Sequence, residues 1–169
     1  KLNDDELLLL CDQIREFLID RVSKTGGHLA SNLGTVELSV AIETVYDTKI
    51  DRLVFDVGHQ SYVHKMLTGR QADFDHLRQF GGMAGFPKPS ESDSDAFVAG
   101  HASSSVSIAL GMARARTALK QDYHVIALLG DGAATGGMAY EGLNDASVSG
   151  EPMIVILNDN AMSIDRNVG

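Results

Sequence analysis

Two polar clusters, each placed directly after an apolar run, are the residues in this sequence best suited to bind a charged ligand. Gly130-Asp131-Gly132 follows the run His124–Leu129, and Asn158-Asp159-Asn160 follows the run Met153–Leu157. Carboxylate and amide oxygens are the ligands that Mg²⁺ prefers, and glycine lets backbone N–H groups come close to a phosphate. If the two clusters meet in space, their chemistry predicts a site for a magnesium ion that carries a diphosphate.

An isolated Gly-Asp-Gly is also common in turns that bind nothing, so Asp131 and Asn160 taken singly remain open to that interpretation. More familiar nucleotide motifs are absent from the sequence. The run Gly130–Thr135 lacks the final Gly or Ala of the dinucleotide-binding fingerprint, and no glycine-rich loop leads into the Lys-Ser/Thr pair of a P-loop. The sequence therefore disfavours hydride transfer from a nicotinamide and P-loop phosphate chemistry.

Three of the six histidines stand directly after a glycine: His28, His59 and His101. At such positions the backbone can approach a ligand and a ring can point into a cleft. An imidazole has an ordinary pKa near neutrality, so it can donate or accept a proton at modest cost. We expect these three to act on a ligand, and we expect His64, His76 and His124 to have structural or surface roles.

The elements that must position these groups are predicted from apolar patterns. The runs His124–Leu129 and Met153–Leu157 are fully apolar after their first residues, and a helix is predicted between them from about Gly136 to Ser149. This order is typical of a βαβ unit with parallel strands buried on both faces. Ligands of parallel sheets bind outside the carboxyl ends of the strands, so both polar clusters are expected in one crevice.

The rest of the chain predicts further elements of an α/β fold. Apolar spacing and capping residues predict a helix from Asn3-Asp4 to Gly26-Gly27, and similar patterns predict more helices and one more strand. These further elements are a helix over 36–46, a strand over 52–57 and a helix over 102–120 that is rich in small residues. The segment 81–100 carries prolines, serines and glycines, which predicts a long irregular loop with a functional role.

Composition limits the classes of partner. The 169 residues carry a net charge of −9 with a pI near 4.9, which opposes binding to nucleic acid or to an anionic membrane. The single cysteine, Cys11, has no partner for an internal disulfide, which predicts a reducing, cytoplasmic location. No apolar run is long enough to span a bilayer. The first residue, Lys1, and the last pair, Val168-Gly169, lead us to expect a segment of a longer protein.

A spacing and four further stretches point to one family. Asp131 and Asn160 lie 29 positions apart, which resembles the thiamine-diphosphate signature of Gly-Asp-Gly followed about thirty residues later by Asn. The further stretches are Gly26–Gly34, Asp56–Gln60, Gly81–Pro87 with Glu91-Ser92, and Asn158–Ile164 with Asn167–Gly169. Together, and in order over essentially the whole chain, they resemble the 1-deoxy-D-xylulose-5-phosphate synthase family more than the transketolases.

The resemblance implies a three-layer α/β/α thiamine-diphosphate-binding fold with a mainly parallel sheet, present here in incomplete form. Residues 1–169 would be its N-terminal, diphosphate-binding domain, while the pyrimidine-binding and C-terminal domains lie outside this sequence. The implied metal ligands are Asp131, Asn160 and the Met162 carbonyl. The implied cofactor contacts are His59, Gly100, His101, Ala102, Gly132, Ala133 and Asn160. His28 would face the substrate; Ala102 departs from the Ser of many members, so only its backbone can serve there.

The implied reaction condenses pyruvate with glyceraldehyde 3-phosphate to 1-deoxy-D-xylulose 5-phosphate and CO₂, with thiamine diphosphate and Mg²⁺ as cofactors. Its product feeds isoprenoid, thiamine and pyridoxal synthesis, and the family resemblance also implies a homodimer. The activating glutamate belongs to the pyrimidine-binding domain, so we expect residues 1–169 alone to be inactive. Two alternatives stay open: ketol transfer of the transketolase type, and a non-catalytic module that keeps the cofactor fold.

Overall fold

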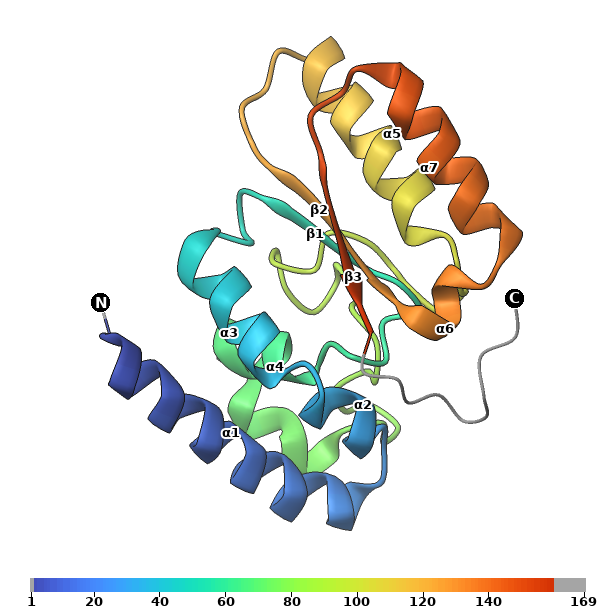
Figure 1. Cartoon of the computed structure of the whole chain (residues 1–169). Coiled ribbons are helices and arrows are strands. Elements are labelled where there is room, and N and C mark those ends of the chain that lie inside the picture. The colour runs from blue at the N-terminus through green and yellow to red at the C-terminus, as the bar shows by residue number, and fades with distance from the viewer. Residues whose placement is uncertain (1, 160–169) are drawn as a thin grey trace.

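The computed structural model describes residues 2–159, and its centre is an open sheet of three parallel strands (Figure 1). The strands lie in the order β1 (Arg52–Phe55), β2 (Val125–Gly130) and β3 (Ile154–Asn158). Both pairings are parallel, and the register places Phe55 opposite Leu128. The predicted α/β class, the βαβ unit and its parallel strands are thereby confirmed.

The helices alternate with these strands along the chain. Their bounds are α1 (Asp4–Thr25), α2 (Leu29–Leu33), α3 (Val36–Val45), α4 (Tyr62–Lys65), α5 (Ser105–Ala118), α6 (Asp131–Ala134) and α7 (Gly137–Ser149). A π-helical turn, η1 (Met66–Arg70), and a 3₁₀ helix, η2 (Gln71–His76), continue α4. No helix among the described residues is long and apolar enough to cross a membrane.

The two faces of the sheet pack against different helices. On one face Phe55 and Ile126 contact Ile42 of α3. On the other face Ala127 packs against Ala109 and Ala113 of α5, where the small side chains allow the close approach that the sequence predicts. Helix α7 packs on α5 on the same side, so helix, sheet and helix form three layers (Figure 1).

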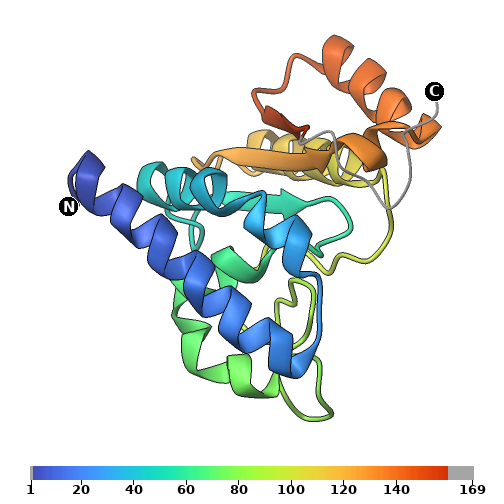
Figure 2. The same ribbon diagram turned by 60° about the horizontal axis from the view of Figure 1, so that its bottom comes forward.

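Helix α1 builds a second core away from the sheet. Its start is fixed by a capping box in which Asn3 and Glu6 hydrogen-bond each other's backbone N–H groups, and its end by Gly26 with φ of 78°. Its buried stripe, which includes Leu18, packs with Tyr62 and Phe74. Figure 2 shows α1 and this part of the chain together on the side of the sheet away from α7.

The structure corrects several predicted bounds. Strand β1 ends at Phe55 rather than at residue 57, because Val57 and Gly58 turn the chain with φ of 59° and 93°. Helix α5 begins at Ser105 rather than at residue 102. The helical segment over 62–76 was not predicted, and the irregular loop over 81–100 is confirmed, since it holds no helix or strand.

Candidate functional site

The carboxyl ends of the three strands meet at one edge of the sheet. Gly130, the last residue of β2, lies opposite Asn158, the last residue of β3. At the other side of β2, the N–H of Asp56 donates to the carbonyl of Leu128 at 2.8 Å, which carries the pairing one residue past β1. The two polar clusters therefore start from adjacent positions, as the sequence predicts.

The predicted metal site lies only partly within the described residues. Asp131 is the first residue of α6, directly after β2, whereas Asn160 and Met162 lie outside the described range. Within residues 2–159 no group of three or more His, Cys, Asp or Glu side chains is arranged to hold a metal ion. The magnesium ligands thus stay a prediction.

A pair of histidine rings lies beyond the end of β1. His28 precedes α2 and His59 follows the turn after β1, and their ring centroids are 5.5 Å apart with the planes at 65°. Phe86, from the loop over 81–100, packs on His28 with a centroid distance of 6.1 Å. The structure therefore joins two of the three predicted histidines with an aromatic ring from the irregular loop.

One buried amide fixes the backbone of both histidines. The Nδ2 group of Asn32 donates to the carbonyl oxygens of His28 and His59, at 2.7 Å each. Its Oδ1 atom accepts the N–H of Tyr62 at 2.9 Å, and the Tyr62 hydroxyl accepts the N–H of His28 at 3.3 Å. Sequence reasoning gave Asn32 no role, although it lies in the stretch Gly26–Gly34 that carried the resemblance.

Burial favours the neutral form of both rings. It lowers the pKa of His28, and the positive charge of Arg78 lowers it further. Burial also lowers the pKa of His59, with a smaller contribution from His28 in the same direction and an opposing one from Asp56. The Nδ1 atoms of both rings are buried with no hydrogen-bond partner among residues 2–159. A neutral imidazole with an unused nitrogen can bind a polar ligand or exchange a proton with it.

The turn that carries His59 needs glycine. Gly58 has φ of 93°, and a Cβ atom there would lie 2.7 Å from Pro87 Cδ and 2.8 Å from Ala99 Cβ. Val57 has φ of 59°, which is unfavourable for a β-branched residue. The loop over 81–100 thus packs tightly against the turn that positions His59.

Asp56 is a second positioning residue that sequence reasoning missed. Its buried carboxylate accepts the N–H of Ser103 at 2.7 Å and the N–H of Ser105 at 3.0 Å. The Ser103 hydroxyl in turn donates to the carbonyl of Ala133 at 2.7 Å. The segment over 100–105, which holds the predicted cofactor contacts Gly100, His101 and Ala102, is therefore tied both to the end of β1 and to α6, the short helix after β2.

Gly100, His101, Ala102 and Gly132 are exposed, and so are open to a ligand. The ring of His101 is not among the ring contacts that join His28, His59 and Phe86 in the described part of the chain. The three predicted histidines thus divide into a packed pair and one exposed residue.

The other histidines have the structural or surface positions that we expect. The His64 ring is buried, and both of its nitrogens are hydrogen-bonded, to Glu43 at 2.6 Å and to Asp95 at 3.0 Å. His76 and His124 are exposed and hydrogen-bond nearby side chains. A lack of neighbouring glycine separates these three from the others in the sequence.

Comparison with known proteins gives one family. The profile of the family described as 1-deoxy-D-xylulose-5-phosphate synthase matches residues 1–169. Curated proteins of that name from three organisms are similar to this chain. The identity is 57% over 168 residues for the protein of Clostridium acetobutylicum, 58% over 169 for that of Desulfotalea psychrophila and 55% over 168 for that of Porphyromonas gingivalis. These alignments cover 99%, 100% and 99% of this chain, but only 27%, 26% and 26% of the relatives. The chain belongs to the 1-deoxy-D-xylulose-5-phosphate synthase family.

Proposed function

We propose that the protein to which this chain belongs condenses pyruvate with glyceraldehyde 3-phosphate to 1-deoxy-D-xylulose 5-phosphate and CO₂. Family membership over the whole chain supports this reaction. The structural observation that carries it is the shared edge of the sheet, where Gly130-Asp131-Gly132 starts beside Asn158. A pair of half-buried histidines, whose neutral form burial favours, lies beyond the end of the neighbouring β1 strand.

The residues at this edge suit thiamine diphosphate and Mg²⁺. The Nδ2 atom of Asn158 is buried with no hydrogen-bond partner among residues 2–159, as are the Nδ1 atoms of His28 and His59. Buried polar atoms are rarely left without a partner, so a polar group from a ligand or from further chain would complete them. The oxygen donors that the family implies, from Asp131 and Asn160, are those that Mg²⁺ prefers.

Bound thiamine diphosphate supplies the electron sink that decarboxylation of a 2-oxo acid requires. In our proposal Asp131, Asn160 and the Met162 carbonyl hold the metal, and the backbone of Gly132 and Ala133 contacts the diphosphate. Each of these groups offers an oxygen or an N–H, so together they neutralise and orient a charged ligand.

The other proposed contacts lie around the histidines. His59 and the segment Gly100–Ala102 contact the cofactor, and His28 binds a substrate oxygen. Because burial favours the neutral form of His28 and His59, either ring can accept a proton at an imidazole nitrogen and return it. Phe86, which packs on His28, shields the His28 ring from water.

We further propose that residues 1–169 are the N-terminal diphosphate-binding domain of a cytoplasmic homodimer. A pyrimidine-binding domain would supply the activating glutamate, so residues 1–169 alone would not turn over. The product would enter isoprenoid, thiamine and pyridoxal synthesis.

A donor assay on the purified full-length protein tests the reaction. With thiamine diphosphate, Mg²⁺ and glyceraldehyde 3-phosphate present, we expect pyruvate to be consumed with one CO₂ released for each 1-deoxy-D-xylulose 5-phosphate formed. Xylulose 5-phosphate should not replace pyruvate as donor. Ketol transfer from xylulose 5-phosphate without release of CO₂ would contradict the proposal and favour a transketolase.

A further inference from the structure

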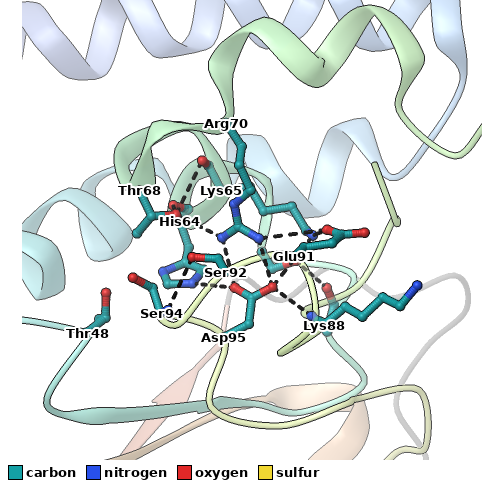
Figure 3. Close-up of polar contacts among 12 residues, drawn as sticks. Thr48, His64, Lys65, Thr68, Arg70, Lys88, Glu91, Ser92, Ser94 and Asp95 are labelled. Atoms are coloured by element: carbon teal, nitrogen blue, oxygen red, sulfur yellow. Dashed lines mark hydrogen bonds and ion pairs between the residues drawn. The ribbon is translucent and has the colours of Figure 1, made fainter. Parts of the chain in front are cut away.

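We propose that a buried cluster of charged side chains positions the loop wall of the histidine site. The cluster joins α3, α4 and η1 to the irregular loop over 81–100, and its His64 ring packs on Phe55, the last residue of β1, with a centroid distance of 5.4 Å. We call it the Asp95 cluster, and its members are Glu43, His64, Lys65, Arg70, Glu91 and Asp95. Figure 3 labels the last five of these.

Asp95 is the centre of the cluster. Its fully buried carboxylate accepts two hydrogen bonds from Arg70, at 2.7 and 2.8 Å, and one from the backbone N–H of Lys88 at 2.7 Å. His64 Nε2 lies 3.0 Å from its Oδ1 atom. Burial alone would raise the pKa of Asp95, but the hydrogen bonds from His64 and Arg70 hold it well below its ordinary value. The carboxylate therefore stays charged and keeps all of these bonds.

A second carboxylate holds the loop at another point. The Glu91 carboxylate accepts a hydrogen bond from the ammonium of fully buried Lys65 at 2.8 Å and another from the backbone N–H of Ala84 at 2.8 Å. Lys65 Nζ also lies 3.8 Å from Asp95, which links the two halves of the cluster. Figure 3 shows Lys65 and Arg70 pointing from the helical segment towards the two carboxylates of the loop.

The contacts hold the loop on both sides of its functional part. Glu91 binds Ala84 and Asp95 binds Lys88, and the residues between these two anchors include Phe86 and Pro87. Phe86 is the ring that packs on His28, and Pro87 lies against the turn at Gly58. Because the loop has no helix or strand of its own, these hydrogen bonds take the place of a regular backbone ladder.

A buried ionic cluster is an inefficient way to gain stability, since apolar residues of similar volume stabilise a core equally well or better. Its particular property is directional bonding, which fixes one arrangement of the groups it joins. Here the arrangement that it fixes is the position of Phe86 over His28. We therefore assign Asp95 and Glu91 as positioning residues for the histidine pair.

The test compares two variants of the full-length protein, Asp95→Asn and Glu91→Gln, with Asp145→Asn as control. Asp145 forms an equally bidentate pair with Arg114, at 2.9 and 2.7 Å, but both side chains are about half exposed and far from the loop in sequence. We measure two quantities: the rate of amide hydrogen exchange over residues 84–99, resolved by peptide, and the rate at which diethyl pyrocarbonate modifies His28. Modification of exposed His124 serves as the internal reference.

We expect exchange over 84–99 to rise at least about tenfold and His28 modification to rise several-fold in both cluster variants, with neither change in the control. The modification rate of His124 should stay the same. Where the variant enzyme turns over, KM for substrate should rise more than kcat falls, because the wall of the site is displaced while its reacting groups remain.

Unchanged exchange over 84–99, or unchanged His28 modification alongside faster exchange, would overturn the proposal. An exchange rate that rises evenly over the whole chain would also overturn it, because the cluster would then contribute only to overall stability. If Asp95→Asn does not fold, the results for Glu91→Gln test the proposal. Glu91 is partly exposed, and glutamine has the same shape as glutamate, so this variant is expected to fold. Of these measurements, only the kinetic one rests on the proposed function. An inactive wild-type protein would contradict that function, whereas hydrogen exchange and His28 modification would still test the role of the Asp95 cluster.

Discussion

Single buried polar residues hold the backbone of the site. Asn32 hydrogen-bonds the carbonyl oxygens of both His28 and His59, and Asp56 accepts two N–H groups at the start of α5. Leaving such a buried group without a partner costs about 1–3 kcal/mol. Substitution of either residue should therefore disturb the site through the backbone, without removing any group that touches a ligand.

The substitution Asp56→Asn tests this. The amide keeps one acceptor oxygen but turns an NH₂ group towards the second N–H donor, so one of the bonds to Ser103 and Ser105 is lost. We expect a loss of about 1–3 kcal/mol in stability, read as a lower melting temperature of the full-length protein. Asp122→Asn, at an exposed position, is the control. Equal melting temperatures for the two variants would show that Asp56 is not an anchor.

The Asp95 cluster predicts that the stability of the protein depends on pH through the titration of His64. Burial alone would lower the pKa of this imidazole, but its hydrogen bonds to Asp95 and Glu43 outweigh burial and raise the pKa above 6.5. The stabilisation from protonated His64 is then complete below pH 6.5 and is lost as the pH rises through the higher pKa of the folded state. The groups around the ring are these two carboxylates, with Lys65 and Arg70 beyond Asp95.

We expect the difference in melting temperature between wild type and His64→Gln to shrink as the pH rises from about 6 to about 9. Taking the difference removes the contributions of the other histidines, which both proteins share. A difference that stays constant with pH, or grows, would show that folding does not raise the pKa of this imidazole.

At the scale of elements, the turn after β1 must accommodate the loop over 81–100. In Gly58→Ala the added Cβ would meet Pro87 and Ala99 at under 3 Å, on a backbone with positive φ. We expect a loss of about 1–3 kcal/mol in stability, together with displacement of His59. Gly111→Ala in α5 is the matched control, because no described atom outside the adjoining residues and the backbone of the helix itself lies within 4 Å of its new Cβ.

That control should be neutral or stabilising by up to about 1 kcal/mol, because alanine favours a helix over glycine. Melting temperatures of the two full-length variants give the comparison. If Gly58→Ala melts as high as Gly111→Ala, the turn is not packed against the loop as described.

Elements with a regular local pattern could be predicted from the sequence, and those fixed by distant contacts could not. The stripe of α1 and the apolar runs of β2 and β3 are local signals. In contrast, Thr68 and Gly69 interrupt the helical dihedral angles over 62–76, which hides that segment from a periodicity argument.

The candidate site divides in the same way. Residues next to glycine or in a known spacing, such as His28, His59 and Asp131, were predicted from the sequence. Asn32 bonds His59, which is 27 positions away, and Asp56 bonds Ser103 and Ser105, which are 47 and 49 positions away. Only the folded chain brings these partners together.

At the scale of the whole molecule, β3 is an edge strand of the sheet formed by residues 2–159, and it carries exposed apolar side chains. Val155 and Leu157 are 37% and 57% exposed, although an α/β sheet normally buries both faces. The chain spans only 26–27% of the length of its curated relatives, and in our proposal further chain of the full-length protein would cover this edge.

In the full-length protein we therefore expect the amides of β3 (Ile154–Asn158) to exchange as slowly as those of β2 (Val125–Gly130). Hydrogen exchange resolved by peptide checks this. Exchange over β3 that is as fast as in the exposed segment over 119–122 would show that the edge stays uncovered.

The most direct test of the account is the affinity of the full-length protein for thiamine diphosphate, measured by calorimetry with and without Mg²⁺. We expect binding to require Mg²⁺ and to weaken by more than about tenfold in Asp131→Ala, with no change in the exposed control Asp122→Ala. Equal affinities of wild type and Asp131→Ala, in the presence of Mg²⁺, would contradict a diphosphate site at the shared edge of β2 and β3.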